Sequence, residues 1–249
     1  ADLYSLMNEG AILAARENRK KVFQFDLIRS IEKVMMGPER KSHLLSKKEK
    51  EITAYHEAGH ALVSSVLPYA DPVHKVSIVA RGSAGGYTLK LPLEEKRLQS
   101  KKEFIDDIAM SLGGYVAEKM IFGDITTGPS SDLQVATNLA SAMVTRWGMS
   151  DLIGPVALAG DDRRGQYGII EEKEFSEASW VKVDSEVSRI IDDGIKSAEK
   201  VLKENKKALD AIAEKLIEVE TLEQAEYEKI IIAHGIIPKK KEAESKEIA

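Results

Sequence analysis

The sequence predicts a mainly α-helical protein with a small β-hairpin or sheet element. Apolar residues recur at helical spacing along most of the 249 residues. Three stretches, beginning at Ser46, Ser100 and Thr221, fit the S/T-x-x-E/Q capping box that opens a helix. Two short runs around a glycine-rich turn are the main β signal.

The N-terminal part of the chain predicts two helices. Residues 2–18 place leucine and isoleucine side chains on one side, and residues 25–36 form a second helix that stops at Gly37-Pro38. Residues 38–46 are highly charged and predict a solvated connector between domains.

The central part begins with a helix opened by Ser46, which we expect to run to about Leu67, before Pro68. Residues 73–79 and 85–91 then predict two strands of a hairpin. The alternating run "VHKVSIV" suggests an edge strand that could pair with an extended peptide.

The second half of the chain is again helical. Ser100 opens one helix expected to reach Gly123, and another begins near Ser130 or Ser131 and ends around Trp147. Residues 149–175 predict loops, and residues 176–233 predict helices, with Thr221 opening the last one. The charged residues 238–249 predict a disordered tail.

Composition excludes several functions. With 36 basic and 41 acidic residues the formal net charge is −5, so no general basic field favours nucleic acid. The chain has no cysteine, which removes disulfides, thiolate catalysis and cysteine-bound zinc. No apolar run approaches the roughly 20 residues of a membrane helix, and we expect this piece to be soluble.

The stretch "AYHEAGHALV" carries the main chemical signal. His56 and His60 are four residues apart on a predicted helix, so both imidazoles leave the same face and can bind one ion. Glu57 is placed to reach a water on that ion. This H-E-x-x-H spacing is typical of zinc metalloproteases.

The spacing leaves the third ligand open. Catalytic zinc takes three protein ligands and a water, and both Glu118 and Asp132 are candidates. Asp132 could instead offset a helix dipole. A di-iron bundle also uses E-x-x-H, but the chain lacks the second such motif.

Several motifs together resemble the peptidase domain of the FtsH family of membrane-anchored AAA metalloproteases. They include "GPERKS", "AYHEAGHALV", "DPVHKVSIVARG", "LGGYVAEKMIFGDITTG" and "SDLQVATNLASAMVTRWGMS", and they follow in order through most of residues 37–160. The resemblance implies zinc bound by His56, His60 and Asp132, with Glu57 as the catalytic residue. Glu118 then becomes a hydrogen-bond partner of the ligands. Residues 129–131 depart from the usual "TTGAxND" pattern.

The same resemblance suggests the domain organisation. Residues 1–37 resemble the end of an AAA helical lid, residues 38–46 a linker, residues 47–237 the zinc peptidase domain, and residues 238–249 a tail. No P-loop is present, so ATP and Mg²⁺ would belong to an ATPase domain outside this chain. A membrane anchor would likewise lie outside it.

The resemblance implies an endopeptidase that acts on unfolded or membrane proteins as a homo-hexamer. It further implies attachment to the bacterial inner membrane with this domain facing the cytoplasm. Two alternatives are a non-catalytic hexamer assembly module and the di-iron carboxylate bundle. We expect no nucleic-acid partner.

Overall fold

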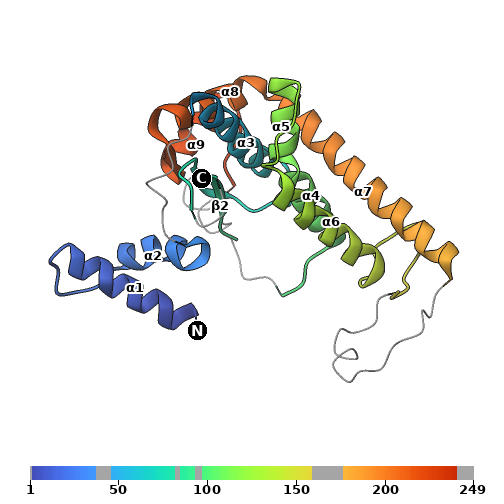
Figure 1. The fold of residues 1–249 in the computed structure, drawn as a ribbon, viewed down its shortest axis with the longest axis horizontal. Helices are drawn as coiled ribbons and strands as arrows, with labels where there is room; N and C mark the ends of the chain where they lie inside the picture. The colour runs from blue at the N-terminus through green and yellow to red at the C-terminus, as the bar shows by residue number, and fades with distance from the viewer. Residues whose placement is uncertain (1, 38–45, 82–84, 93–96, 159–175, 240–249) are drawn as a thin grey trace, which may run out of the picture.

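Nine helices and three short strands make up the part of the chain that the computed structural model describes (Figure 1). The described residues are all except 1, 38–45, 82–84, 93–96, 159–175 and 240–249. The helices are α1 (Asp2–Arg16), α2 (Gln24–Met36), α3 (Lys47–Val66), α4 (Lys101–Ser111), α5 (Gly113–Phe122), α6 (Ser130–Thr145), α7 (Glu177–Glu204), α8 (Lys206–Val219) and α9 (Gln224–Ala233). The strands are β1 (Val73–Ser77), β2 (Tyr87–Lys90) and β3 (Thr221–Glu223). The mainly α-helical class with a small sheet is confirmed.

Helix α3 is the centre of the larger core. Its predicted capping box forms, since the Ser46 hydroxyl accepts a hydrogen bond from Glu49 N at 3.2 Å and Ser46 N donates to Glu49 Oε2 at 2.8 Å. Its second half is buried on nearly every side, because α5, α8, α4, α7 and the sheet all pack against it. A helix surrounded in this way is a rigid base for the side chains that it carries.

The sheet has the order β2-β1-β3, with both pairs antiparallel. Two predictions are wrong here. Thr221 does not open the last helix but begins β3, where its hydroxyl contacts Ser77 Oγ at 2.8 Å, and Glu223 caps α9 instead. The run from Val73 is the central strand and not an edge, so the edge strands of the described sheet are β2 and β3.

The single helix predicted between Ser100 and Gly123 is two helices. The chain turns at Leu112, between α4 and α5. At this turn Gly113 lies against α3, where a Cβ added to Gly59 would stand 2.5 Å from the Gly113 carbonyl oxygen. Only glycine permits so close an approach of two backbones, and this contact places α5 beside the two histidines.

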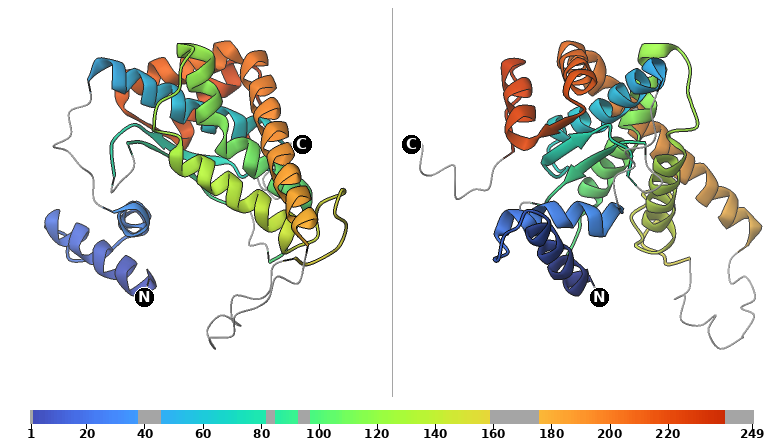
Figure 2. Two further views of the ribbon diagram at one scale, coloured as in Figure 1. Left: turned by 45° about the vertical axis from the view of Figure 1, so that its right-hand side comes forward. Right: turned by 60° about the vertical axis from the view of Figure 1, so that its left-hand side comes forward.

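A second core cluster lies among α4, α6 and α7. Phe104, Ile108 and Leu112 pack there against Ala136, Ala140 and Met143 of α6 and against residues of α7. Figure 2 shows α6 and the long α7 running along the same side of the molecule as α4. This cluster fixes where α6 begins, and the start of α6 carries Asp132.

Helices α1 and α2 pack on each other as a hairpin that stands to one side of the other elements (Figures 1 and 2). Arg19 binds both carboxylate oxygens of Asp26, and Lys33 pairs with Glu9. Neither core cluster includes a residue of 1–37. The predicted connector at 38–46 lies outside the described residues except for Ser46.

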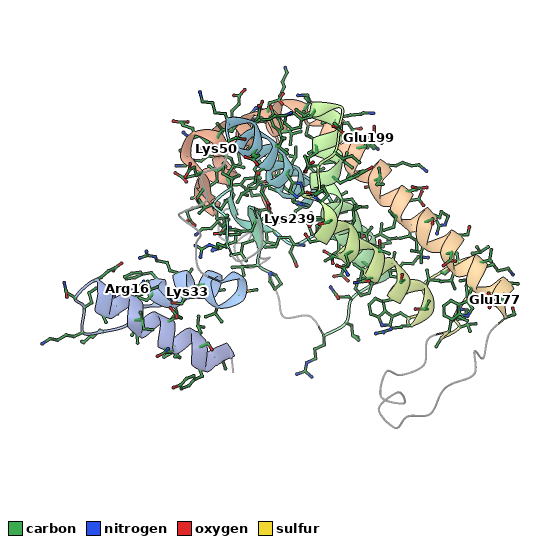
Figure 3. All side chains as sticks on the ribbon, viewed as in Figure 1. Arg16, Lys33, Lys50, Glu177, Glu199 and Lys239 are labelled. Atoms are coloured by element: carbon green, nitrogen blue, oxygen red, sulfur yellow. The ribbon has the colours of Figure 1, made fainter. Side chains whose placement is uncertain are left out.

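The C-terminal end is described as far as Lys239, near the centre of the view in Figure 3. Its ammonium group donates to the carbonyl oxygens of Ser64, at 2.6 Å, and Leu67, at 2.5 Å, where α3 ends. The predicted tail covers residues 238–249, of which 240–249 lie outside the described residues. Among the described helices, none is long and apolar enough to cross a membrane.

Candidate metal centre

His56 and His60 lie one turn apart on the same face of α3. Both residues are buried, at 9% and 7% exposure, and their Nε2 atoms are 3.0 Å apart. Two imidazole nitrogens this close together are a favourable arrangement when both bind one metal ion that lies between them. The predicted pairing of these histidines is therefore present in the structure.

The Nδ1 atom of each imidazole has a hydrogen-bond acceptor. His56 Nδ1 lies 2.8 Å from Glu118 Oε1, and His60 Nδ1 lies 2.8 Å from the Met110 carbonyl oxygen. A carbonyl oxygen can only accept, so His60 donates its Nδ1–H. In the metal-binding form both imidazoles are neutral and donate from Nδ1, so their Nε2 lone pairs face each other.

Asp132 comes from the first turn of α6. Its Oδ2 lies 3.2 Å from His56 Nε2 and 3.5 Å from His60 Nε2. Three donors of a tetrahedral zinc ion, each about 2.0–2.1 Å from the metal, are about 3.3–3.4 Å from one another. The three observed separations fit that ion. Among the described residues, this is the one group of three potential metal ligands.

Charge reinforces the arrangement. Burial disfavours the imidazolium form of His56, but hydrogen bonds with the carboxylates of Asp132 and Glu118 outweigh it and raise the pKa of His56 to about 10. Burial also opposes ionisation of Asp132, yet the imidazoles of His56 and His60 hold the pKa of that carboxyl well below its usual range. The pocket thus attracts a cation, and a metal ion on Nε2 takes the position of a proton.

Glu118 lies near the centre, but its oxygens already have partners. Oε1 faces His56 Nδ1, and Oε2 accepts from both the backbone N and the hydroxyl of Thr126, each at 2.9 Å. The residue is 1% exposed. These hydrogen bonds lower the pKa of Glu118 against the opposing effect of burial, so the group is an anion that orients His56.

Glu57 is buried at 5% exposure on the same helix. Its Oε2 accepts a hydrogen bond from the Thr88 hydroxyl of β2 at 2.9 Å, and burial raises the pKa of the carboxyl. A cavity of about 730 Å³ opens over this group. Its lining includes the four site residues together with Gly86, Thr88 and Lys90 of the β2 segment.

Some contributors were not foreseen. Thr88, Thr126 and the Met110 carbonyl bind the site residues from elsewhere in the chain. Gly114 leaves room for the His56 ring, because an added Cβ would lie 2.5 Å from it. The paired glycines inside an otherwise helical pattern were the available signal for that close contact.

The site combines three features: a helix with the H-E-x-x-H pattern, an aspartate from a second helix, and an adjacent cavity. Together they are typical of single-metal H-E-x-x-H proteases. The chain belongs to peptidase family M41, whose model matches residues 43–230.

Similar proteins agree with that assignment. The ATP-dependent zinc metalloprotease FtsH of Veillonella parvula is 48% identical over 225 residues, which are 90% of this chain and 35% of that protein. The protein of the same name from Bacillus subtilis is 44% identical over 244 residues, 96% of this chain and 38% of that protein. FtsH 1 of Sphaerobacter thermophilus is 48% identical over 230 residues, or 92% of this chain and 35% of that protein.

The chain is thus a zinc metalloprotease domain, and it spans little more than a third of the length of these relatives. The donor set fits zinc, the metal in the relatives' names. Family membership favours this class over the di-iron bundle.

Proposed function

We propose that His56, His60 and Asp132 hold the zinc ion and that Glu57 is the catalytic residue of an endopeptidase. The observation that carries the proposal is the set of three donor atoms 3.0, 3.2 and 3.5 Å apart beside a buried carboxylate. Two neutral imidazoles and one carboxylate leave a divalent ion with a net charge of +1. That charge favours the oxyanion that forms when a peptide carbonyl is attacked.

Zinc, when bound, supplies a Lewis acid that makes water nucleophilic at neutral pH and polarises the scissile carbonyl. Glu57 moves the protons. Because Oε2 accepts from Thr88, we assign Oε1 as the atom that receives the proton of the attacking water and delivers it to the leaving amine. Burial raises the pKa of Glu57, which strengthens it as a base.

Substrate binding is proposed along β2. This strand pairs with β1 on one side, and its residues Tyr87, Thr88 and Lys90 line the cavity. An extended peptide added there would be held by its main chain, which tolerates many sequences. The substrate class that suits such binding is unfolded protein.

Several further proposals concern the whole protein. The relatives' names support dependence on ATP. We propose that the ATP and Mg²⁺ sites belong to a domain outside this chain. We further propose that α1 and α2 are the end of an AAA helical lid, that the protein assembles as a homo-hexamer, and that it is anchored in the bacterial inner membrane with this domain in the cytoplasm.

Cleavage of an unstructured fluorogenic peptide, with bound zinc quantified, tests the catalytic proposal. Glu57→Gln should keep one zinc per chain and lose roughly 10²–10⁴-fold in rate, as loss of a general base does. Glu218→Gln, at an exposed carboxylate of α8, is the matched control and should cleave like the native chain. A native chain that binds zinc but cleaves nothing, alone or as a full-length hexamer, would make the domain an assembly module.

A further inference from the structure

We propose that Thr88 is a positioning residue that holds the Glu57 carboxylate in its working orientation. The inference rests on the proposed role of Glu57 and adds a residue to that site. Thr88 lies on β2, 31 positions along the chain from Glu57, and reaches it only because the sheet packs beside α3.

The contact between the two side chains is direct. Thr88 Oγ1 lies 2.9 Å from Glu57 Oε2 and 3.2 Å from the Glu57 carbonyl oxygen. A threonine hydroxyl has one hydrogen, and the nearer, charged oxygen is the stronger acceptor. The hydroxyl therefore donates to the carboxylate, which fixes the rotation of that group and assigns its two oxygens different roles.

Gly86 leaves room for the same carboxylate, because a larger residue there would collide with it. A Cβ added at Gly86 would lie 2.8 Å from Glu57 Oε1 and 2.9 Å from Glu57 Cγ. It would also lie 2.8 Å from the Ser77 carbonyl oxygen, a backbone atom that cannot easily move. The Thr88 hydroxyl thus holds Glu57 Oε2 by a hydrogen bond, and the carboxylate has room beside Oε1 because residue 86 has no Cβ.

The segment itself is well anchored. Thr88 pairs with Val76 of the central strand, and the buried ring of Tyr87 faces the guanidinium of Arg81 at 5.6 Å. Because β2 is also the strand proposed to pair with substrate, one rigid element sets the position of the bound peptide and the position of the Glu57 carboxylate. Such shared support controls the distance between the base and the reacting atoms, where an error of about 1 Å can cost roughly 10²-fold in rate.

Three substitutions test the assignment. Thr88→Val keeps the shape and removes the hydroxyl, whereas Thr88→Ser keeps the hydroxyl. Thr221→Val is the matched control, because it removes a hydroxyl that bonds Ser77 at 2.8 Å on the other side of the same sheet. For each chain, kcat and KM on an unstructured fluorogenic peptide, zinc per chain and the thermal unfolding midpoint are measured.

We expect Thr88→Val to lower kcat roughly 10–100-fold through misplacement of the base, with KM within about twofold of native. Zinc content should stay at the native level, since Thr88 touches no proposed ligand. Thr88→Ser should restore most of kcat. Thr221→Val should match Thr88→Val in unfolding midpoint while keeping native kcat.

A native-like kcat for Thr88→Val, an equal loss in Thr88→Ser, or an equal loss in Thr221→Val would each overturn the inference while leaving the proposed function intact, provided that Glu57→Gln abolishes cleavage. If Glu57→Gln cleaves like the native chain, the proposed function fails and this inference fails with it.

Discussion

The two imidazoles of α3 are oriented by what their Nδ1 atoms bind. One acceptor is a buried carboxylate on α5 and the other is a backbone carbonyl near the end of α4. Both contacts preset the Nε2 atoms before any metal arrives. Preset ligands lose little conformational freedom on binding, which increases affinity.

The first prediction concerns Glu118. Glu118→Gln should weaken zinc binding about 10–100-fold, because the amide is a poorer acceptor for the His56 Nδ1–H and removes a negative charge from the centre. Competition with a chromogenic chelator measures the affinity. Glu186→Gln is the control, since it neutralises an equally buried carboxylate that binds Ser150 and Arg189 far from the site. Equal affinities in the two variants would contradict the orienting role.

At the scale of single residues, the sequence predicted the pair His56 and His60 but few of the residues around it. His56 and His60 follow from a spacing of four on one helix. Asp132 does not follow from spacing, because its placement depends on how α6 packs, and the family resemblance was needed to favour it over Glu118. Thr88 was missed because a hydroxyl on a strand has no pattern that links it to a distant glutamate.

The contact of α3 with α5 is the element-scale feature that builds the site. Gly59 and Gly113 meet backbone to backbone, and a Cβ on Gly113 would lie 2.8 Å from the Gly59 carbonyl oxygen. This approach brings Glu118 of α5 to His56 of α3. Side chains at either glycine would separate the two helices and, with them, the carboxylate and the imidazole.

Gly113→Ala should therefore cost about 1–3 kcal/mol of stability, as overpacking of a close contact does. It should also weaken zinc binding, since α5 moves away from His56. Chemical denaturation and chelator competition provide the two measurements. Gly85→Ala is the stability control, because an added Cβ there meets nothing within 4 Å. If both variants unfold alike, the glycine contact does not hold the helices together.

The hairpin of α1 and α2 should respond to acid. Arg19 is the main cause that lowers the pKa of Asp26 to about 2, from its usual 3.8. A carboxyl with a lowered pKa stabilises the folded state fully above about pH 4, and that stabilisation is lost as the pH falls through about 2. Hydrogen exchange of residues 2–36 between pH 5 and 2 measures the loss.

In Asp26→Asn the same residues should exchange faster already at pH 5, and lowering the pH should change them less. Asp184→Asn on α7 is the control and should leave the hairpin unchanged, since Asp184 lies outside it. A native chain whose hairpin exchanges equally at pH 5 and pH 2 would contradict the role of the Arg19–Asp26 pair.

Local signals predicted most elements, and long-range packing decided the exceptions. The boxes at Ser46 and Ser100 form because each needs only four neighbouring residues. The box at Thr221 does not, because pairing with β1 competes for the same residues and prevails. The break at Leu112 was missed because its cause is the approach of α3, which lies about 50 positions earlier in the chain.

At the scale of the molecule, the two core clusters draw only on residues after the hairpin. We therefore predict that a chain of residues 38–249 keeps native zinc binding and a native unfolding midpoint, measured by calorimetry with and without zinc. A chain ended before Gln224 is the contrast, because it loses the buried Tyr227 and Ile231 and should unfold. A large drop in midpoint for residues 38–249 would show that the hairpin supports the peptidase core.

The central claim is that His56, His60 and Asp132 are the zinc ligands, and anomalous diffraction at the zinc edge from crystals of the zinc-loaded chain tests it most directly. We predict one peak per chain, about 2.0–2.2 Å from His56 Nε2, His60 Nε2 and an Asp132 carboxylate oxygen. Glu118 should remain on His56 Nδ1. A peak bound by Glu118 in place of Asp132, or one away from the two histidines, would contradict the account.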